Sequence, residues 1–484
     1  MTDSFVEREL KFDVQTGFVV PDVANLLPHG GRIESSVEHL CSDYFDTADQ
    51  ALLRAGMTLR RRSGSTDTGW QLKVPHEPFR EEIRAELLSA YVPQELLDML
   101  RGISRGQRVV QTASLRTQRT VTRLLDGSGR MLAEIDDDTV DAFPADESVP
   151  AHRWREVEVE LGHDDHSEDS LNMLAALDTH LRQAGARPSA ASSKIARALA
   201  KPSANAKKKR KLHAGDLIAA YLAEQQRVIL TGDLALRRGD EGAIHKTRVA
   251  TRRLRSTLRS FHTFVDRERA TSLDAELQWY AALLGEVRDR HVLQQRLDTM
   301  AASLDDSMRP DAIRAVIDAA LCAELDEHWR VLQAALIVDR YLALLADIDD
   351  WVRNPPWTTQ AQKPARNVPR AARKAEKKVS KRLEHAVASG DIHQMHGVRK
   401  AAKRARYAAE AAQDAKGHGA TVQALLELLG EHQDSLTSAA FLQRLGASTE
   451  ADGSAFALGI LYENEQRTAR LARKKARRVA KKRP

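Results

Sequence analysis

The residues best suited to chemistry form a short run of alternating charges near the start of the chain. Glu7, Glu9 and Lys11 are spaced two residues apart, so on a strand their three side chains would share one face. Carboxylate oxygens are the ligands that Mg²⁺ and Mn²⁺ prefer, and a neighbouring ammonium suits the phosphate of a metal-bound substrate. These are residue types that divalent-metal chemistry on a phosphate compound would use, if other strands add to the same face.

The same alternation returns on later stretches of the first part of the chain. The sets are Arg60 and Arg62; Gln71 and Lys73; Arg80, Glu82, Arg84 and Glu86; Glu134, Asp136 and Asp138; and Glu156, Glu158 and Glu160. Apolar residues such as Val157 and Val159 fall on the opposite face, as a closed antiparallel barrel with a charged lumen requires. On a single strand the pattern is more typical of the solvated face of a sheet. Its recurrence with both signs of charge favours a site.

A second pattern is a basic stripe that occurs twice in the later part of the chain. The first copy is His245, Arg248, Arg252 and Arg255, and the second is His396, Arg399, Lys403 and Arg406. Steps of three, four and three place each set on one face of a helix, where like charges repel by a few tenths of a kcal/mol per pair. Leu284-Gly285-Glu286 and Leu429-Gly430-Glu431 follow the two copies. We expect a polyanion to neutralise these stripes, the alternative being solvated helix faces or pairs with nearby Glu.

The charge balance divides the chain into two modules. The net charge of the 484 residues is +6, yet residues 1–200 carry 23 Lys and Arg against 33 Asp and Glu, and the rest carries 51 against 35. An acidic first module could hold metal, and a basic second module could attract an anionic polymer.

The local patterns predict an α+β protein of two domains. Short alternating strands with two helical stretches fill residues 1–200, followed by a polar, basic linker over residues 201–211. Residues 212–484 are rich in Ala, Leu, Arg and Glu at helical spacing, and the repeated stripe predicts two similar helical bundles at about 212–350 and 360–484. The segment from Arg467 onward carries ten Lys and Arg and no acid, and is either a helix end or a disordered basic tail.

Several classes of protein are not expected. The sequence contains no apolar run of the roughly 18 residues that a membrane span needs, and its start lacks the layout of a secretory signal. Only Cys41 and Cys322 are present, which excludes a disulfide framework and favours a reducing compartment. We expect a cytoplasmic protein with no membrane partner.

The first module resembles the CYTH family, the triphosphate tunnel metalloenzymes, which include inorganic triphosphatases, thiamine triphosphatases and class IV adenylate cyclases. The resemblance lies in Glu7-x-Glu9-x-Lys11, Tyr44-Phe45-Asp46-Thr47, Leu59-Arg60-x-Arg62, Trp70-x-Leu72-Lys73, Arg80-x-Glu82, Glu156-x-Glu158-x-Glu160 and Ser193-Lys194. It implies an N-terminal eight-stranded antiparallel tunnel with helices, which hydrolyses a triphosphate with Mg²⁺ or Mn²⁺.

The resemblance also implies roles for individual residues. Metal ligands would be Glu7, Glu9, Glu134, Asp136, Glu156, Glu158 and Glu160. Phosphate contacts would be Lys11, Arg60, Arg62, Lys73, Arg80, Arg119 and Lys194. Glu7, Glu9, Lys11 and Glu158 would be the catalytic set. Many members carry a Lys two residues before the position of Arg119, and Thr117 stands there in this chain, which is a departure in how phosphate is gripped.

The second module resembles the CHAD family, whose segments read H-x-x-R-x-x-x-R-R-x-R. Residues 245–255 match this pattern, and residues 396–406 match it with Lys403 in place of the first paired Arg. The resemblance implies a C-terminal all-helical domain with pseudo-twofold halves that binds inorganic polyphosphate. The expected ligands are His245, Arg248, Arg252, Arg253, Arg255, His396, Arg399, Lys403, Arg404 and Arg406. The histidines lack the compact spacing of a metal-ligand set, so phosphate donors are the better prediction. Nucleic acid is expected to bind only nonspecifically, since no aromatic residue interleaves with the first stripe.

Two hypotheses follow for the whole chain. In the first, the tunnel hydrolyses inorganic triphosphate, or a related triphosphate or short polyphosphate, while the helical domain holds polyphosphate and associates the protein with polyphosphate granules. In the second, the tunnel is degenerate and the protein only binds polyphosphate. The full acidic set favours the enzyme. An adenylate cyclase or a thiamine triphosphatase would use the same groups and is the remaining alternative.

Overall fold

The computed structural model describes residues 3–64, 68–76, 79–87, 89–162, 168–200, 211–389, 391–413, 420–448 and 454–481. By internal contacts the chain separates into two compact units, Met1–Lys207 and Lys208–Pro484. Except for Lys211, the predicted linker lies outside the described residues. Each unit is described by itself below.

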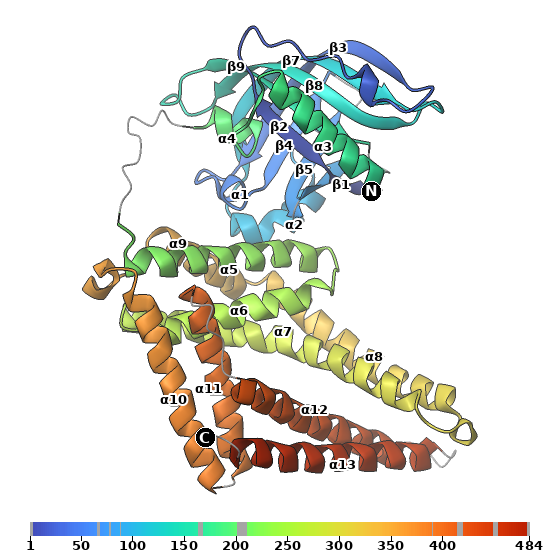
Figure 1. The fold of residues 1–484 in the computed structure, drawn as a ribbon, viewed down its shortest axis with the longest axis vertical. Helices are drawn as coiled ribbons and strands as arrows, with labels where there is room; N and C mark the ends of the chain where they lie inside the picture. Colours follow the sequence, from blue (N-terminus) through green and yellow to red (C-terminus); the bar gives the residue numbers. More distant parts are fainter. Residues whose placement is uncertain are drawn as a thin grey trace. The chain divides into compact units, whose positions relative to one another are not determined.

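The first unit is built on one antiparallel sheet (Figure 1). Its strands are β1 (Asp3–Glu7), β2 (Glu9–Asp13), β3 (Arg32–Asp46), β4 (Thr58–Ser63), β5 (Gly69–His76), β6 (Phe79–Ala85), β7 (Val110–Leu125), β8 (Met131–Pro144), β9 (His152–Leu161) and β10 (Arg187–Pro188). Their order is β1-β6-β5-β4-β3-β7-β8-β9-β2-β10. The prediction of an antiparallel β tunnel followed by an all-helical domain is confirmed.

The sheet closes on itself because β1 and β2 are consecutive parts of one strand. Glu7 pairs with Arg80 on β6, and Glu9 pairs with Glu160 on β9, so the chain changes partner at Arg8. With β1 and β2 taken together and the two-residue β10 set aside, the eight expected strands form a ring. The sheet therefore has ten strands among the described residues, where the sequence predicted eight.

Alternation along the strands sends the charges inward and the apolar residues outward. Phe12, Val157 and Val159 are buried against Leu177 and Leu181 of α3 (Glu168–Gln183), which covers one outer side of the ring. The core thus lies between sheet and helix, and the lumen remains for polar groups. The shorter helices are α1 (Ala51–Arg54), α2 (Gln94–Ser104) and α4 (Lys194–Ala198).

The second unit is helical throughout (Figure 1). Its helices are α5 (Ala214–Arg237), α6 (Ala243–Ser260), α7 (Arg267–Ala301), α8 (Pro310–Leu336), α9 (Asp339–Arg353), α10 (Asn367–Ser389), α11 (Ile392–Ala411), α12 (Ala420–Ser448) and α13 (Ser454–Lys481). In the part of the chain that the structure describes, none of the helices has the length and apolarity needed to cross a membrane.

The helices repeat in the same order in the two halves of this unit. α5 packs on α6 and α7 on α8, just as α10 packs on α11 and α12 on α13. The long pairs of the two halves share one core, in which Leu297 and Ile317 meet Leu442 and Leu458. The basic segment from Arg467 belongs to α13 as far as Lys481, so of the two predictions for it the helix end is the one observed.

Candidate functional site

The charged side chains of the first unit converge inside the ring. The lining residues are Glu7, Lys11, Tyr44, Thr58, Arg60, Arg62, Lys73, Arg80, Glu82, Arg84, Arg119, Glu134, Asp136, Glu158, Glu160, Ser193 and Lys194. The free space between them is only about 50 Å³. Acidic and basic groups therefore face one another at contact distance.

Strand register sets the carboxylates in rows across β2, β9 and β8. Glu160 has Glu9 on one side and Glu134 on the other, while Glu158 has Lys11 and Asp136. Directly opposed side chains on one face of an antiparallel pair lie within about 5.5 Å at Cβ. The alternating acids of three separate sequence segments consequently form one acidic wall.

Lysines bridge this acidic wall to the rest of the lumen. Lys11 Nζ lies 2.6 Å from Glu9 Oε2 and also pairs with Glu158. Lys73 pairs with Glu7, and its Nζ lies 3.4 Å from Glu82 Oε2. Burial by itself would lower the pKa of Lys11. The negative charges of Glu158 and Glu9 have the larger effect together, so the pKa of Lys11 is raised. Both lysines are thus held as ammonium groups.

Asp138 organises the other end of the acidic wall. This fully buried carboxylate accepts hydrogen bonds from Arg119 Nε at 2.8 Å and Nη2 at 2.7 Å, and Lys194 Nζ lies 3.1 Å from it. Lys194 Nζ also lies 2.8 Å from Glu156 and pairs with Glu158. The sequence patterns assigned no role to Asp138. Its place in the Glu134-x-Asp136-x-Asp138 alternation was the available signal.

The acidic wall is also the part of the structure best suited to a metal. Ligand oxygens of Asp138, Glu156 and Glu158 lie within 4.8 Å of one another. Glu7 Oε2 and Asp136 Oδ1 are buried and accept no hydrogen bond from any residue that the structure describes. Buried carboxylates with unused oxygens fit a hard divalent cation. In this structure the Lys194 ammonium is the cation at the three-carboxylate cluster.

Crowding raises the proton affinity of two of these acids. Burial, together with the nearby Asp138, Glu134 and Glu158, raises the pKa of Asp136 to about 8, even though Arg119 is in contact. Burial, followed by the charge of Glu7, raises the pKa of Glu160 well above its usual range. A cation bound at the wall would compete with protons for these groups.

Arg62 is a lumen cation that an added anion would stabilise. Its side chain is buried, and Nε has no hydrogen-bond partner among the described residues. Burial, then the charges of Arg60 and Arg119, lower the pKa of Arg62 to about 10. A buried guanidinium beside two others is stabilised by a multiply charged anion.

The remaining predicted residues divide into three groups. Arg80 donates a hydrogen bond to the Ser192 carbonyl at 2.9 Å and lines the lumen. Glu9 and Glu156 reach lining residues through Lys11 and Lys194 rather than lining the free space themselves. Thr117, at the position of the family lysine, is buried on β7 and pairs in register with Leu40 and Val140.

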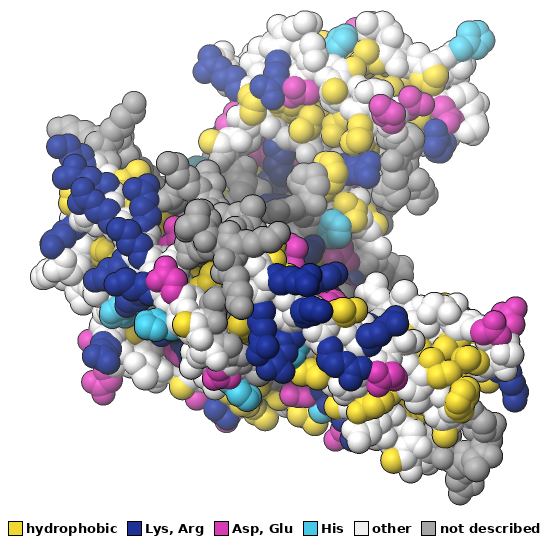
Figure 2. Space-filling view, turned by 60° about the horizontal axis from the view of Figure 1, so that its bottom comes forward, with side chains coloured by type: hydrophobic (Ala, Val, Ile, Leu, Met, Phe, Trp, Pro, Cys, Tyr) yellow, Lys and Arg dark blue, Asp and Glu magenta, His cyan; other side chains and the backbone are white. Residues whose placement is uncertain are grey.

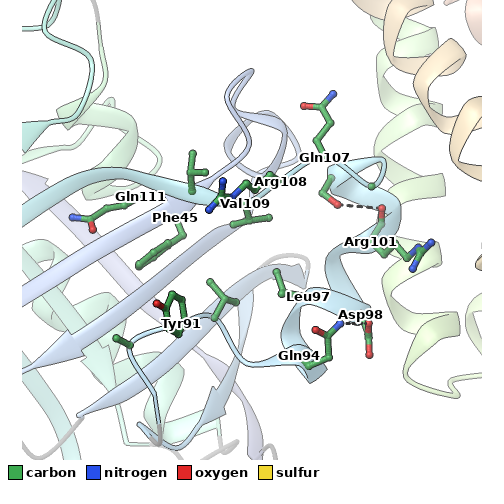
Figure 3. Close-up of a pocket in the computed structure, with 15 residues that line it drawn as sticks. Phe45, Tyr91, Gln94, Leu97, Asp98, Arg101, Gln107, Arg108, Val109 and Gln111 are labelled. Atoms are coloured by element: carbon green, nitrogen blue, oxygen red, sulfur yellow. Dashed lines mark hydrogen bonds between the residues drawn. The ribbon is translucent and has the colours of Figure 1, made fainter.

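A larger pocket of the same unit lies outside the tunnel. It encloses about 620 Å³ between α2, the preceding loop and the start of β7, with Phe45, Tyr91 and Leu97 among its lining residues (Figure 3). It shares no lining residue with the lumen and holds a single carboxylate, from Asp98. Of the two cavities, the lumen is therefore the one whose lining combines several carboxylates with several cations.

In the helical unit, the two stripes meet where α6 packs against α11. The residues that come together are Arg248, Arg252, Arg399, Lys403 and Arg406, named the stripe cluster below. Burial first, and then the charges of Arg252, Arg399, Arg406 and Arg248, lower the pKa of Lys403 to about 8. Arg399 Nε is buried without a hydrogen-bond partner among the described residues.

An aromatic ring from the end of the second stripe, Tyr407, belongs to this cluster. The guanidinium of Arg252 lies 5.9 Å from the ring centre of Tyr407, and those of Arg253 and Arg406 lie 5.8 and 5.0 Å away. Tyr407 comes from the second half and the first stripe from the first half, so no local pattern could place them together. Since Tyr407 is buried, its ring orients arginines and offers no stacking surface.

Carboxylates hold several of the predicted polyphosphate ligands, two of the stripe cluster included. Arg248 Nη1 lies 2.8 Å from Asp289 Oδ1, and Arg406 Nε lies 3.5 Å from Glu410 Oε1. Outside the cluster, Arg253 Nε lies 3.0 Å from Glu410, and Arg255 Nε lies 3.0 Å from Asp274. Burial, followed by the charges of Arg288, Arg248 and Arg252, lowers the pKa of His245. The side chain of His396 lies outside the described residues.

Comparisons with known proteins agree with this arrangement. The model of the CYTH domain matches residues 6–187, and the model of the CHAD domain matches residues 220–443. The Mycobacterium tuberculosis protein Rv2226 of strain H37Rv is 33% identical over 482 residues, which cover 95% of this chain and 93% of the relative.

Solved structures of low identity resemble parts of the chain. PptA from Streptomyces chartreusis is 20% identical with a TM-score of 0.48, and the similarity covers 56% of this chain and 100% of that one. The CHAD domain from the plant Ricinus communis is 21% identical with a TM-score of 0.44, covering 59% and 97%. The domain matches in series, together with a relative that aligns over nearly the whole chain, show that this protein belongs to the CYTH and CHAD families, with a CYTH domain followed by a CHAD domain.

Proposed function

We propose that the tunnel hydrolyses inorganic triphosphate, or a related triphosphate or short polyphosphate, with Mg²⁺ or Mn²⁺. The observation that carries the proposal is the buried Arg62, which lies beside Arg60 and Arg119 and across the lumen from a wall of carboxylates. An acidic wall suits a metal and a basic wall suits phosphates, so a metal–triphosphate complex would neutralise both.

Binding would proceed by exchange of ion pairs. Lys11, Lys73 and Lys194 now neutralise Glu158, Glu7 and Glu156. Entry of a triphosphate would draw the three ammonium groups to phosphate oxygens, and the released carboxylates would then hold the metal. When bound, the metal would neutralise phosphate charge and supply an activated water for in-line attack. The lumen would keep the phosphate chain aligned.

The metal ligands within this proposal are those implied by the resemblance. Glu7, Glu9, Glu156 and Glu158 are the principal set, with Glu134, Asp136 and Glu160 beside them in register. Glu7, Glu9, Lys11 and Glu158 would form the catalytic set, and Lys11, Arg60, Arg62, Lys73, Arg80, Arg119 and Lys194 would hold phosphate.

A substrate panel tests the tunnel directly. Purified protein is incubated with inorganic triphosphate, ATP, thiamine triphosphate or polyphosphate, with Mg²⁺ or Mn²⁺, and phosphate and cyclic AMP are measured. Release of phosphate from triphosphate that stops when EDTA is added is expected. Cyclic AMP as the main product, or faster cleavage of thiamine triphosphate, would favour one of the alternative enzymes. No turnover of any substrate would favour the binding protein.

We further propose that the helical unit binds inorganic polyphosphate through the stripe cluster. Support comes from Lys403, whose four strongest charged neighbours are all arginines. A flexible chain of phosphates would relieve that repulsion and release its own counterions. Polyphosphate labelled at one end should be retained by the protein and resist competition from single-stranded RNA at equal phosphate concentration. Displacement by RNA would contradict phosphate specificity.

The location follows from this proposal. A cytoplasmic protein that binds polyphosphate is expected to associate with polyphosphate granules, and residues 1–200 and 212–484 would act as catalytic and binding modules. Fluorescence microscopy of the tagged protein, with and without polyphosphate in the cell, tests this expectation.

A further inference from the structure

The basic end of α13 is a second cationic surface of the helical unit, formed by residues outside the stripe cluster. Arg470, Arg473, Lys474, Arg477 and Arg478 line a shallow cavity of about 360 Å³ on one face of the helix. Small residues hold the opposite face: Ala469, Ala472 and Ala476 are buried. The cations are therefore on an ordered helix face, with their spacing fixed by the helix.

A second row of cations lies on the neighbouring helix. Along α10, exposed basic pairs recur at Arg373 and Lys374, Lys377 and Lys378, and Lys381 and Arg382. Val379, Leu383 and Ala386 of the same helix are buried and share a hydrophobic cluster with Ala476 of α13. Because α10 and α13 are in contact, the two rows of cations lie on neighbouring helices. Figure 2 shows how densely Lys and Arg side chains populate the face of the helical unit that it brings forward.

Helix packing connects this face with the helix that carries the second stripe. α10 is in contact with both α11 and α13. Arg404 of α11 lies next to Lys403 in the sequence, and its pKa is lowered by burial and then by the charges of Arg382 and Arg259. Cations therefore occur on three helices that contact one another in the order α11, α10 and α13.

Maintaining such a face without an anion is unfavourable. Like charges three or four residues apart destabilise a helix by a few tenths of a kcal/mol per pair. No Asp or Glu occurs in the sequence after Glu465, and α10 carries only Glu376 and Glu384 against its seven Lys and Arg. The basic parts of both helices also lack aromatic residues. This chemistry suits a linear polyanion recognised by its backbone charge and gives no means of reading bases.

We propose that the α10–α13 basic face, defined as Lys377, Lys378, Lys381 and Arg382 with Arg473, Lys474, Arg477 and Arg478, extends the stripe cluster into a track for long polyphosphate. The inference rests on polyphosphate binding by the helical unit, as proposed above. A short chain fills the stripe cluster alone. A longer chain reaches the second surface as an intramolecular event at high effective concentration, so affinity rises with chain length.

The experiment measures the affinities of short-chain and long-chain polyphosphate for the full chain at equal phosphate concentration. The test variant carries Arg473→Gln, Lys474→Gln and Arg478→Gln, since glutamine preserves helix propensity. The control carries Arg267→Gln, Arg314→Gln and Arg330→Gln on α7 and α8, which removes the same charge elsewhere on the helical unit.

The test variant should bind long chains about tenfold more weakly or worse, with a salt slope lower by about 2, since each contact on a single strand contributes about 0.7. Short-chain affinity should stay within about twofold, and the control should lose little at either length. An unchanged long-chain affinity, equal losses at both lengths, or a control that matches the test variant would overturn the track.

The same measurement separates this inference from the proposed function. If the unaltered protein binds neither chain length, polyphosphate binding itself fails. If it binds both equally and the test variant binds like it, only the track fails. Duplex DNA serves as a third probe. If the unaltered protein binds DNA more tightly than polyphosphate, and the test variant no longer binds DNA, the face is a nucleic-acid site and the proposal is overturned.

Discussion

The guanidinium of Arg248 lies flat against the helix backbone at Gly285, where an added Cβ would come within 3.3 Å of Nη2. The second half repeats the arrangement: a Cβ on Gly430 would lie 3.2 Å from Nη2 of Arg399. Glycine in the middle of a long helix costs about 1 kcal/mol relative to alanine, so its presence at both positions calls for a reason. The close approach of an arginine from the stripe cluster is that reason.

We therefore expect Gly285→Ala and Gly430→Ala to raise stability while weakening polyphosphate binding. Alanine should add about 0.5 to 1 kcal/mol to the free energy of unfolding, but its methyl group should push the arginine outward and weaken binding about three- to tenfold. Thermal unfolding and polyphosphate titration measure the two effects. The control is Gly459→Ala on α13, where a Cβ meets nothing within 4 Å. Unchanged binding in the first two variants would contradict the positioning role.

Polyphosphate affinity should fall as the pH rises past about 8. The pKa of Lys403 in the free protein is about 8, because burial and four arginines disfavour its charge. Below that pH the ammonium is already charged and binding needs no proton. Above it, binding requires proton uptake, and each pKa unit between free and bound states is worth about 1.4 kcal/mol. The free energy of unfolding should change in the opposite direction to the affinity. Folding lowers the pKa of Lys403, so the charged lysine destabilises the folded state, and this cost decreases as the pH rises above about 8.

Lys403→Arg isolates this effect. Arginine keeps its charge throughout the range, so the variant should bind with little pH dependence between about pH 7 and about pH 9. Titrations at constant ionic strength provide the measurement. A variant with the same pH profile as the unaltered protein would show that another group is responsible.

Asp138→Asn should destabilise the tunnel far more than the same change at its neighbour. Asp138 is fully buried between Arg119 and Lys194, and removing one member of a buried ion pair costs about 3 to 5 kcal/mol. Asp137 makes an equally bidentate pair with Arg155 on the outer face, at 2.8 and 2.6 Å, where the loss should be about 1 kcal/mol or less. Urea unfolding of the two variants compares them. Similar losses would mean that the buried network is not a principal source of stability.

The period-two alternation located the strands and their inward face, because that period follows from strand geometry alone. It could not show that Lys194, from a short helix after the last long strand, inserts its ammonium between Asp138, Glu156 and Glu158. Nor could helical spacing show that Tyr407 contacts Arg252, or that Arg253 and Arg255 are held by carboxylates. These contacts form between elements that are far apart in the sequence. The pattern of charges along the chain does not show which cations are paired with carboxylates and which can bind an added anion.

Arg62→Gln should separate activity from stability in the tunnel. The guanidinium is buried next to Arg60 and Arg119, and its Nε has no hydrogen-bond partner among the described residues. Its charge therefore destabilises the folded state of the free protein. Its removal should leave the free energy of unfolding unchanged or higher. In the proposed complex it holds phosphate by charge-assisted hydrogen bonds worth about 1.5 to 3 kcal/mol, so kcat/KM for triphosphate should fall about 10- to 150-fold.

The adjacent Arg61 provides the matched control for this prediction, since it sits on the same strand but pairs with Asp43 at 2.8 Å on the other face. Arg61→Gln should leave kcat/KM within about twofold and reduce stability by about 1 kcal/mol at most. Steady-state phosphate release and thermal unfolding, measured on both variants, give the four values needed. If Arg62→Gln lowers both kcat/KM and the free energy of unfolding, the role of Arg62 is structural. A cation whose only partner is the bound anion should instead leave the ligand-free protein equally stable or more stable when it is removed.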